Sequence, residues 1–148
     1  MATKPTATAV TRSAEVRTPQ QTYSATAPDM PSLGECLVRS AVGLRDRIAV
    51  KALVEEEQLL TRDNVRTALV AKQNGVMICR WEGMAGRLYT LGLSESERAF
   101  LGLVLSIVGL RHSYLSTVEF LDERRLQIVL RAITRLAGEG RSGIAMLS

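Results

Sequence analysis

Apolar residues recur at helical spacing along most of the chain from residue 33 onward, which is the pattern of amphipathic helices. Ser32 and Glu35 have the spacing of a capping box, so a first helix is predicted to begin directly after Pro31. Its inward face is formed by Leu33, Leu37, Val38, Ala41 and Leu44. Gly43 then weakens the helical pattern, and "GLRDR" favours a bend between two helices over one long rod.

The second helix lies in "RIAVKALVEEEQLL". Its predicted inward residues are Ile48, Ala49, Ala52, Leu53 and Leu60. The three consecutive glutamates Glu55, Glu56 and Glu57 are predicted to point outward. They are interpreted as a solvated acidic face rather than as a metal site or an acid–base pair.

A third, shorter helix is predicted over residues 62–73, within "LLTRDNVRTALVAKQNG". Thr61 is its expected N-cap, and Asn74-Gly75 its expected end, because Gly75 readily adopts the left-handed conformation found after helices. After Gly75 the apolar period changes from helical to alternating. Residues 76–91 therefore predict a β-hairpin that reverses between Gly83 and Gly86.

Two longer helices are predicted to follow the hairpin. In "SESE", Ser94 and Glu97 have capping-box spacing, and the helix from Glu95 to Leu110 is apolar on nearly all sides. The segment "STVE", residues 116–119, has the same spacing and predicts a last helix that runs to Ala137.

Composition adds a boundary near the N-terminus. All four prolines of the 148-residue chain fall within residues 1–31, which hold almost no large apolar side chains. This segment is predicted to be a flexible tail, with a transit peptide as the less favoured alternative. The predicted fold is mainly α with one β-hairpin. It comprises a module over residues 32–93, a C-terminal helical hairpin over 94–138 and a loose C-terminus over 139–148.

Net charge and cysteine content bear on the kind of partner and on the cellular compartment. The net charge of +4 permits an anionic partner without requiring one. Cys36 and Cys79 lie far apart and have no metal-type spacing, which favours a reduced, cytoplasmic setting. No apolar run is long enough to span a bilayer, so no membrane partner is expected.

Residues 48–91 resemble the winged helix-turn-helix of bacterial regulators of the GntR and MarR types. The matching positions are Leu53, Thr61, Arg62, Val65, Ala68, Leu69 and Gly75. The chain departs from that pattern in a slightly longer turn, where Gln58-Leu59 replaces the usual Gly. The resemblance implies a non-enzymatic DNA-binding transcriptional regulator. Residues 62–73 would be its recognition helix in the major groove of duplex DNA, and residues 76–91 its wing.

Polar side chains near the start of this helix have the chemistry that base reading needs, since Arg pairs with guanine edges and Asn with adenine. The predicted DNA-binding residues are Thr61, Arg62, Asn64, Arg66, Thr67, Arg80 and Arg87. Asp63 would repel the DNA backbone unless it pairs with Arg66 or reads a cytosine. The alternative is a protein-interaction module, such as an adaptor, inhibitor or antiactivator, in which the same helix is an ordinary capped surface helix.

The apolar helix from Glu95 to Leu110 is expected to need more cover than one further helix and a small module provide. A homodimer about a two-fold axis is therefore predicted. Its interface would contain Gly102, Leu105, Ser106 and Gly109. The alternative is that this helix is the central core of a monomer.

The pattern does not favour an enzyme. His112 is the only histidine, and no acid or nucleophile is apparent around it. The glycine spacings do not match a phosphate-binding loop, and Trp81 is expected to be a packing anchor. No metal or cofactor is predicted. A basic face on the last helix is expected to be solvated; it consists of Arg124, Gln127, Arg131 and Arg135.

Overall fold

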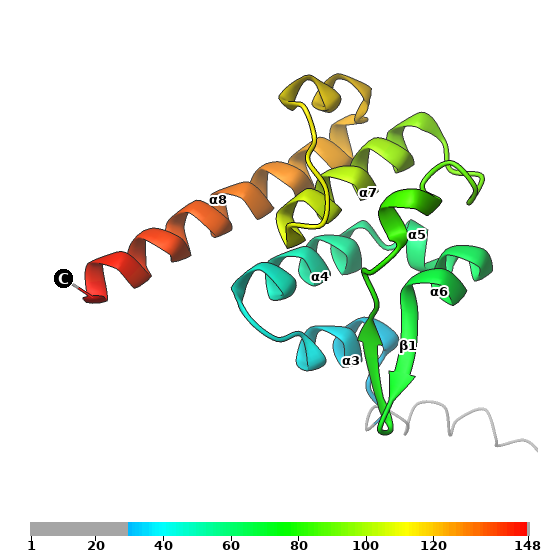
Figure 1. Cartoon of the computed structure of the whole chain (residues 1–148), viewed down its shortest axis with the longest axis horizontal. Helices are drawn as coiled ribbons and strands as arrows, with labels where there is room; N and C mark the ends of the chain where they lie inside the picture. The colour runs from blue at the N-terminus through cyan, green and yellow to red at the C-terminus, as the bar shows by residue number, and fades with distance from the viewer. Residues whose placement is uncertain (1–29, 148) are drawn as a thin grey trace, which may run out of the picture. The chain divides into compact units, whose positions relative to one another are not determined.

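A computed structural model describes residues 30–147, of which 140–147 are described by backbone alone. The described chain is mainly helical and contains a two-stranded antiparallel hairpin (Figure 1). The predicted flexible tail lies outside the described residues, apart from Met30 and Pro31. From Leu33 onward the chain forms one compact unit.

The predicted bend between the first two helices is confirmed. Helix α3 (Leu33–Ser40) ends before Gly43, whose φ of 87° turns the chain into α4 (Leu44–Glu56). Such a positive φ suits glycine, which has no Cβ to clash with the backbone. The predicted inward residues of α4 are buried: Ile48, Ala49, Ala52 and Leu53.

The prediction that Glu55, Glu56 and Glu57 all point outward is wrong for Glu56. Glu56 has no exposed surface, whereas Glu57 is exposed. Helical spacing explains the difference, because Glu56 lies one turn after Ala52 and so falls on the buried side of α4. Glu57 follows the end of α4, and its φ of 69° lies in the left-handed region and redirects the chain into α5 (Gln58–Thr61).

The predicted helix over residues 62–73 is shorter than expected. Helix α6 (Asp63–Leu69) ends at Leu69, and the chain continues directly as strand β1 (Val70–Gln73). Thr61 is the last residue of α5 instead of an N-cap, and its hydroxyl donates to the Gln58 carbonyl at 2.7 Å. Arg62 occupies the N-cap position of α6, with no capping hydrogen bond from its side chain.

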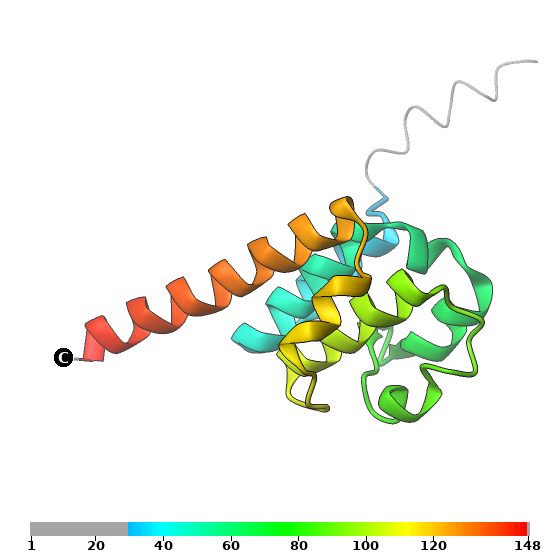
Figure 2. The ribbon, with the colours of Figure 1, turned by 90° about the horizontal axis from the view of Figure 1, so that it is seen from above.

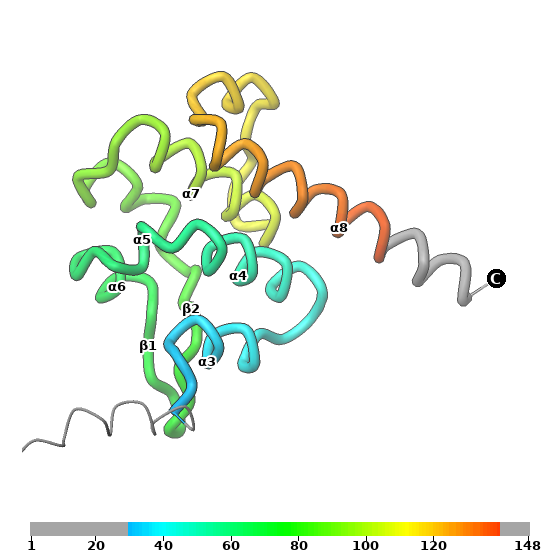
Figure 3. The backbone as a smooth tube through the Cα atoms, turned by 180° about the vertical axis from the view of Figure 1, so that it is seen from behind, coloured from blue at the N-terminus to red at the C-terminus, as the bar shows by residue number. Residues whose placement is uncertain are grey.

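Asn74-Gly75 forms the turn of a hairpin and does not end a helix. Strand β1 pairs with β2 (Val76–Cys79), with Val70 opposite Cys79. The turn residues have φ values of 54° and 79°, as a two-residue hairpin turn requires. Asn-Gly is a strong hairpin signal, and here it overrides the helical spacing of the preceding residues. Helix α3 lies beside β2 (Figure 3). The Ser40 hydroxyl in α3 donates to the Met77 carbonyl in β2 at 2.7 Å.

The predicted hairpin over residues 76–91 is therefore displaced. Its second half contains the 3₁₀-helix η3 (Met84–Arg87) and no strand. The apolar residues that suggested a strand instead anchor an irregular segment on the core, since Leu88 and Leu91 are buried. Trp81 is a packing anchor as predicted: it is buried, and its indole donates to the Asp46 carboxylate at 2.7 Å.

Helix α7 (Glu95–Val108) has the capping box predicted for Ser94 and Glu97, with both hydrogen bonds present. The helix lies against α4 and α8, which also contact each other (Figure 2). Its fully buried side chains include Phe100, Leu101 and Val104. Within the described chain α7 is thus a central element of the core.

The last helix begins later than predicted. Residues Leu115–Phe120 form the 3₁₀-helix η4, and α8 spans Glu123–Leu147. The Asp122 carboxylate accepts a hydrogen bond from the Arg125 amide at 2.8 Å, so an aspartate performs the capping that the sequence pattern assigned to Ser116. The backbone of α8 continues past Gly138, so the expected loose end over 139–148 is helical as far as Leu147.

Candidate functional site

Arg62 and Asn64, which were predicted to read DNA, bind distant parts of their own chain. Arg62 donates to the Glu97 carboxylate at 2.7 Å and to the Gly92 carbonyl at 2.9 Å. Asn64 donates to the Leu91 carbonyl at 2.7 Å. These contacts fix the segment after η3 to the start of α6, which is a structural role for both side chains.

The remaining predicted residues differ in exposure. Arg66 forms an ion pair with Asp63 and donates to the Leu60 carbonyl at 2.9 Å, so the pairing expected for Asp63 is present. Thr61 and Thr67 are exposed.

Arg80 and Arg87 are also exposed, but they do not flank one hairpin. Arg80 follows β2, and Arg87 ends η3.

The residues predicted for a dimer interface are largely used within the monomer. Gly102 and Leu105 are buried, and Ser106 is half-buried. Gly109 ends α7 with a φ of 98°. The apolar sides of α7 are covered by α4, α8 and the connecting segments, so the premise of an uncovered stripe is wrong.

A buried ionic cluster joins α4, α5, α7 and α8. Arg125 is 6% exposed and Glu56 is 0% exposed, and two guanidinium nitrogens of Arg125 donate to one Glu56 oxygen at 3.0 and 2.7 Å. Arg125 also donates to Gln58 at 2.9 Å and pairs with Asp122. Burial alone would lower the pKa of Arg125, but hydrogen bonding to Glu56 and its negative charge outweigh burial and raise it.

Two carboxylates at the edge of this cluster have lowered pKa values. Burial alone would raise the pKa of Glu97, but the Ser94 amide and the charge of Arg62 outweigh it and lower the value. The hydrogen bond from the Arg125 amide is the main cause that lowers the pKa of Asp122. Every member of the cluster has a partner within the chain, so its role is to hold α8 in place.

The basic face predicted on α8 is not simply solvated. Arg131 and Arg135 both reach the Glu55 carboxylate, at 3.4 and 3.3 Å. Arg124 donates to the Glu55 and Glu56 carbonyls at 2.9 and 2.7 Å, which satisfies the end of α4. Sequence spacing placed these arginines on one side of α8 but gave no indication that α4 lies beneath it.

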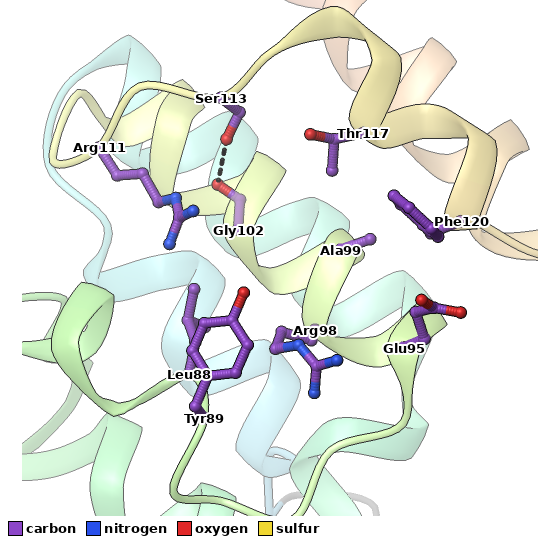
Figure 4. A pocket seen from close by; sticks show the side chains of 10 residues that line it. All are labelled: Leu88, Tyr89, Glu95, Arg98, Ala99, Gly102, Arg111, Ser113, Thr117 and Phe120. Carbon is purple, nitrogen blue, oxygen red and sulfur yellow. Dashed lines mark hydrogen bonds between the residues drawn. The ribbon is translucent and has the colours of Figure 1, made fainter.

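A groove of about 220 Å³ lies between helix α7, η4 and the residues Leu88 and Tyr89, which follow η3 (Figure 4). Its floor is the α7 surface at Ala99 and Gly102, and its rim includes Tyr89, Thr117 and Phe120. A Cβ at Gly102 would lie 3.8 Å from both the Arg111 Nε and a Leu88 methyl group. The Arg111 guanidinium therefore lies within ordinary contact distance of α7 at Gly102.

Three charged residues line the groove: Glu95, Arg98 and Arg111. The Arg98 guanidinium lies 4.6 Å from the centre of the Tyr89 ring and donates to the Leu93 carbonyl at 3.3 Å. The Arg111 Nε is buried and has no hydrogen-bond partner among the described residues. Glu95 and Arg111 form no ion pair with any residue in the described part of the chain.

The segment between α7 and α8, which lines one side of this groove, carries several exposed apolar side chains. Tyr114 and Leu115 are 84% and 80% exposed, and Leu110 and Phe120 are also exposed. With Tyr89 and the groove, we call these residues the η4 face. The sequence did not indicate this face, because a helix was predicted to begin at the capping box of residues 116–119 and to run to Ala137.

Other chemistry has little support in the described residues. They contain no group of three His, Cys, Asp or Glu side chains placed to hold a metal. Within the same residues, no helix has both the length and the apolar character needed to cross a membrane. Burial, with a smaller contribution from Asp46, raises the pKa of Cys79 to about 12, so this thiol stays protonated at neutral pH.

The η4 face is thus a surface where unused apolar area and an unpartnered buried donor coincide. Of the predicted DNA-reading side chains, Arg62, Asn64 and Arg66 are bound within the fold. Comparisons with protein families, with curated proteins and with solved structures find no match to this chain.

Proposed function

We propose that this protein is a non-enzymatic protein-interaction module that binds its partner through the η4 face. The observation that carries the proposal is that Tyr114, Leu115 and Phe120 are exposed on a segment that also lines a groove, in which the Arg111 Nε lacks an acceptor. Tyr and Arg are enriched among the residues that dominate binding energy at protein interfaces. An exposed apolar group beside such a groove is typical of a surface that a partner covers.

DNA binding is the second candidate function. Its support is the order of helices α4, α5 and α6 before a hairpin, together with exposed Thr61, Thr67, Arg80 and Arg87. Its difficulty is that Arg62 and Asn64 would have to release Glu97 and Leu91 before they reached a base. Leaving a buried acceptor without its donor is unfavourable.

The proposal is tested by two variants with matched exposure. Leu115 is 80% exposed on the η4 face, and Val42 is 81% exposed between α3 and α4. Each is replaced by Asp in the full chain, and partner recovery from extracts of the source cells is measured by quantitative mass spectrometry. We expect Leu115→Asp to lose the partner and Val42→Asp to retain it. Equal recovery with both variants would contradict the proposal.

DNA binding is measured separately by fluorescence polarisation with random duplex DNA at low and high salt. The interaction proposal predicts weak binding that Arg80→Ala and Arg87→Ala hardly change. Strong binding that weakens steeply with salt and is lost in both variants would favour the DNA-binding alternative.

A further inference from the structure

We infer that the groove of the η4 face receives a carboxylate side chain of the partner protein, and that Arg111 binds it. This inference rests on the proposed function. Arg111 is placed for it because its guanidinium enters the groove beside Gly102, where α7 has no side chain (Figure 4).

The state of Arg111 indicates an absent acceptor. Its Nε is buried and has no hydrogen-bond partner among residues 30–139, where side chains are described. Buried polar atoms of folded proteins are rarely left in this state, and a charged donor is the most unfavourable to leave unpaired. The described residues give the Arg111 guanidinium no hydrogen bond or ion pair, so a carboxylate in the groove would supply its acceptor.

The size of the groove limits what enters. Its volume of about 220 Å³ is below the roughly 300–1,000 Å³ typical of sites for drug-sized ligands. One side chain fits a space of this size, and a planar carboxylate matches the forked donors of a guanidinium.

The charges that line the groove match a single carboxylate. Glu95 lines the same space and has no ion-pair partner within the described chain. Together with Arg98 and Arg111 it leaves one net positive charge in the groove, which one carboxylate neutralises. Arg98 adds positive charge, although its guanidinium already contacts Tyr89 and the Leu93 carbonyl.

The surroundings favour a protein over a free small anion. Tyr114 and Leu115 do not line the groove, yet both are highly exposed on the same connecting segment. A free anion in the groove would leave these apolar side chains in water. A protein that inserts one acidic side chain covers them as well.

The test uses the full chain labelled with ¹⁵N at arginine and three soluble peptides of the form Ac-Ser-Leu-X-Phe-Ser-NH₂. X is Glu, Gln or phosphoserine, and acetate and inorganic phosphate are titrated as free anions. Nε–Hε signals report the site, and fluorescence polarisation of dye-labelled peptides reports affinity. We expect the Glu peptide to shift the Arg111 signal saturably and to bind at least about tenfold more tightly than the Gln peptide.

Arg111→Ala should weaken binding of the Glu peptide by about tenfold to a hundredfold, while Arg87→Ala, outside the groove, should not. Thermal melts of both variants show whether the fold is retained. An unmoved Arg111 signal, or equal affinity for the Gln peptide, overturns the inference. Tighter binding of the phosphoserine peptide would show a phosphopeptide site, and equal binding of acetate would show a site for free anions.

Failure of this inference is distinguishable from failure of the proposed function. If Leu115→Asp loses the partner but the Glu peptide does not reach Arg111, only the carboxylate assignment is wrong. If the Glu peptide binds at Arg111 but Leu115→Asp keeps the partner, the η4 face is not the interaction surface. Self-association that requires Arg111, measured by sedimentation, would identify a second copy of the chain as the occupant and overturn the assignment to a different protein.

Discussion

The buried pair of Glu56 and Arg125 should be the most sensitive point of the fold. In Arg125→Met the Glu56 carboxylate would keep only the Leu59 amide, at 2.8 Å, and would lose both guanidinium donors. An uncompensated charge at a position with no exposure destabilises a fold by about 3–5 kcal/mol. Domains of this size are stable by only about 5–15 kcal/mol, so the variant should lie near the limit of folding.

Two further variants distinguish the effect of the buried charges on stability from the effect of packing. Glu56→Gln keeps an acceptor for Leu59, and Arg125 keeps its ion pair with Asp122, so the expected loss is smaller, about 1–3 kcal/mol. The double variant Glu56→Leu with Arg125→Met removes both buried charges, and its loss should be smaller than the sum of the single losses.

Urea denaturation followed by circular dichroism gives each free energy of unfolding. A loss below about 1 kcal/mol for Arg125→Met would refute the reasoning, because it would mean that the Glu56 carboxylate finds water or another partner in the folded chain.

Three other predictions concern pH, glycine conformation and thiol reactivity. The pKa values of Glu97 and Asp122 are lowered from ordinary values of 4.5 and 3.8, so the ionised carboxylates stabilise the fold at pH values above 4.5 and 3.8. The free energy of unfolding should therefore fall as the pH drops below these ordinary values. Urea denaturation from neutral to acid pH checks this, and Glu97→Gln should make the decline less steep. Gly102→Ala should raise the free energy of unfolding by about 0.5–1 kcal/mol, since a Cβ there meets only ordinary contacts at 3.8 Å. Gly75→Ala should lower the free energy of unfolding by about 1–2 kcal/mol, because the φ of Gly75 is 79°. A shift of the melting temperature in the same direction for both variants would contradict this prediction. With its pKa raised to about 12, half-buried Cys79 should react with iodoacetamide much more slowly than an unfolded-chain thiol at neutral pH. Fast labelling found by mass spectrometry would contradict the raised pKa.

The sequence predicted the elements that carry strong local signals. The apolar period of α4 and α7 reflects two buried helices, and the Ser94–Glu97 capping box marks the start of α7. The bend at Gly43 follows from a residue that tolerates positive φ. Each of these signals lies within a few neighbouring residues, which is why sequence reasoning found them.

The predicted helix boundaries were wrong where two local sequence signals compete. The helical spacing of Val65 and Leu69 continued into a segment that Asn74-Gly75 turns into a hairpin. Likewise, Ser116 and Asp122 both resemble helix caps, and the helix begins after the second. Local propensity did not decide between the alternatives, because packing against the rest of the chain does.

The site residues depended on contacts that no local pattern contains. Arg62 meets a carboxylate 35 positions away, and Arg125 meets one 69 positions away. These partners convert apparent DNA-reading or solvated arginines into structural ones. The groove at Arg111 likewise requires η3, α7 and η4 to meet, and the first and last of these were predicted as other elements.

The central claim is that the η4 face is the surface through which this protein binds another protein. A photoreactive amino acid placed at position 115, and in a matched control at position 42, tests it directly, because both native side chains are equally exposed. After irradiation in cells, we predict that position 115 crosslinks to one discrete protein partner and that position 42 does not. Crosslinks from both positions to the same proteins, or from position 115 to nucleic acid alone, would contradict the account.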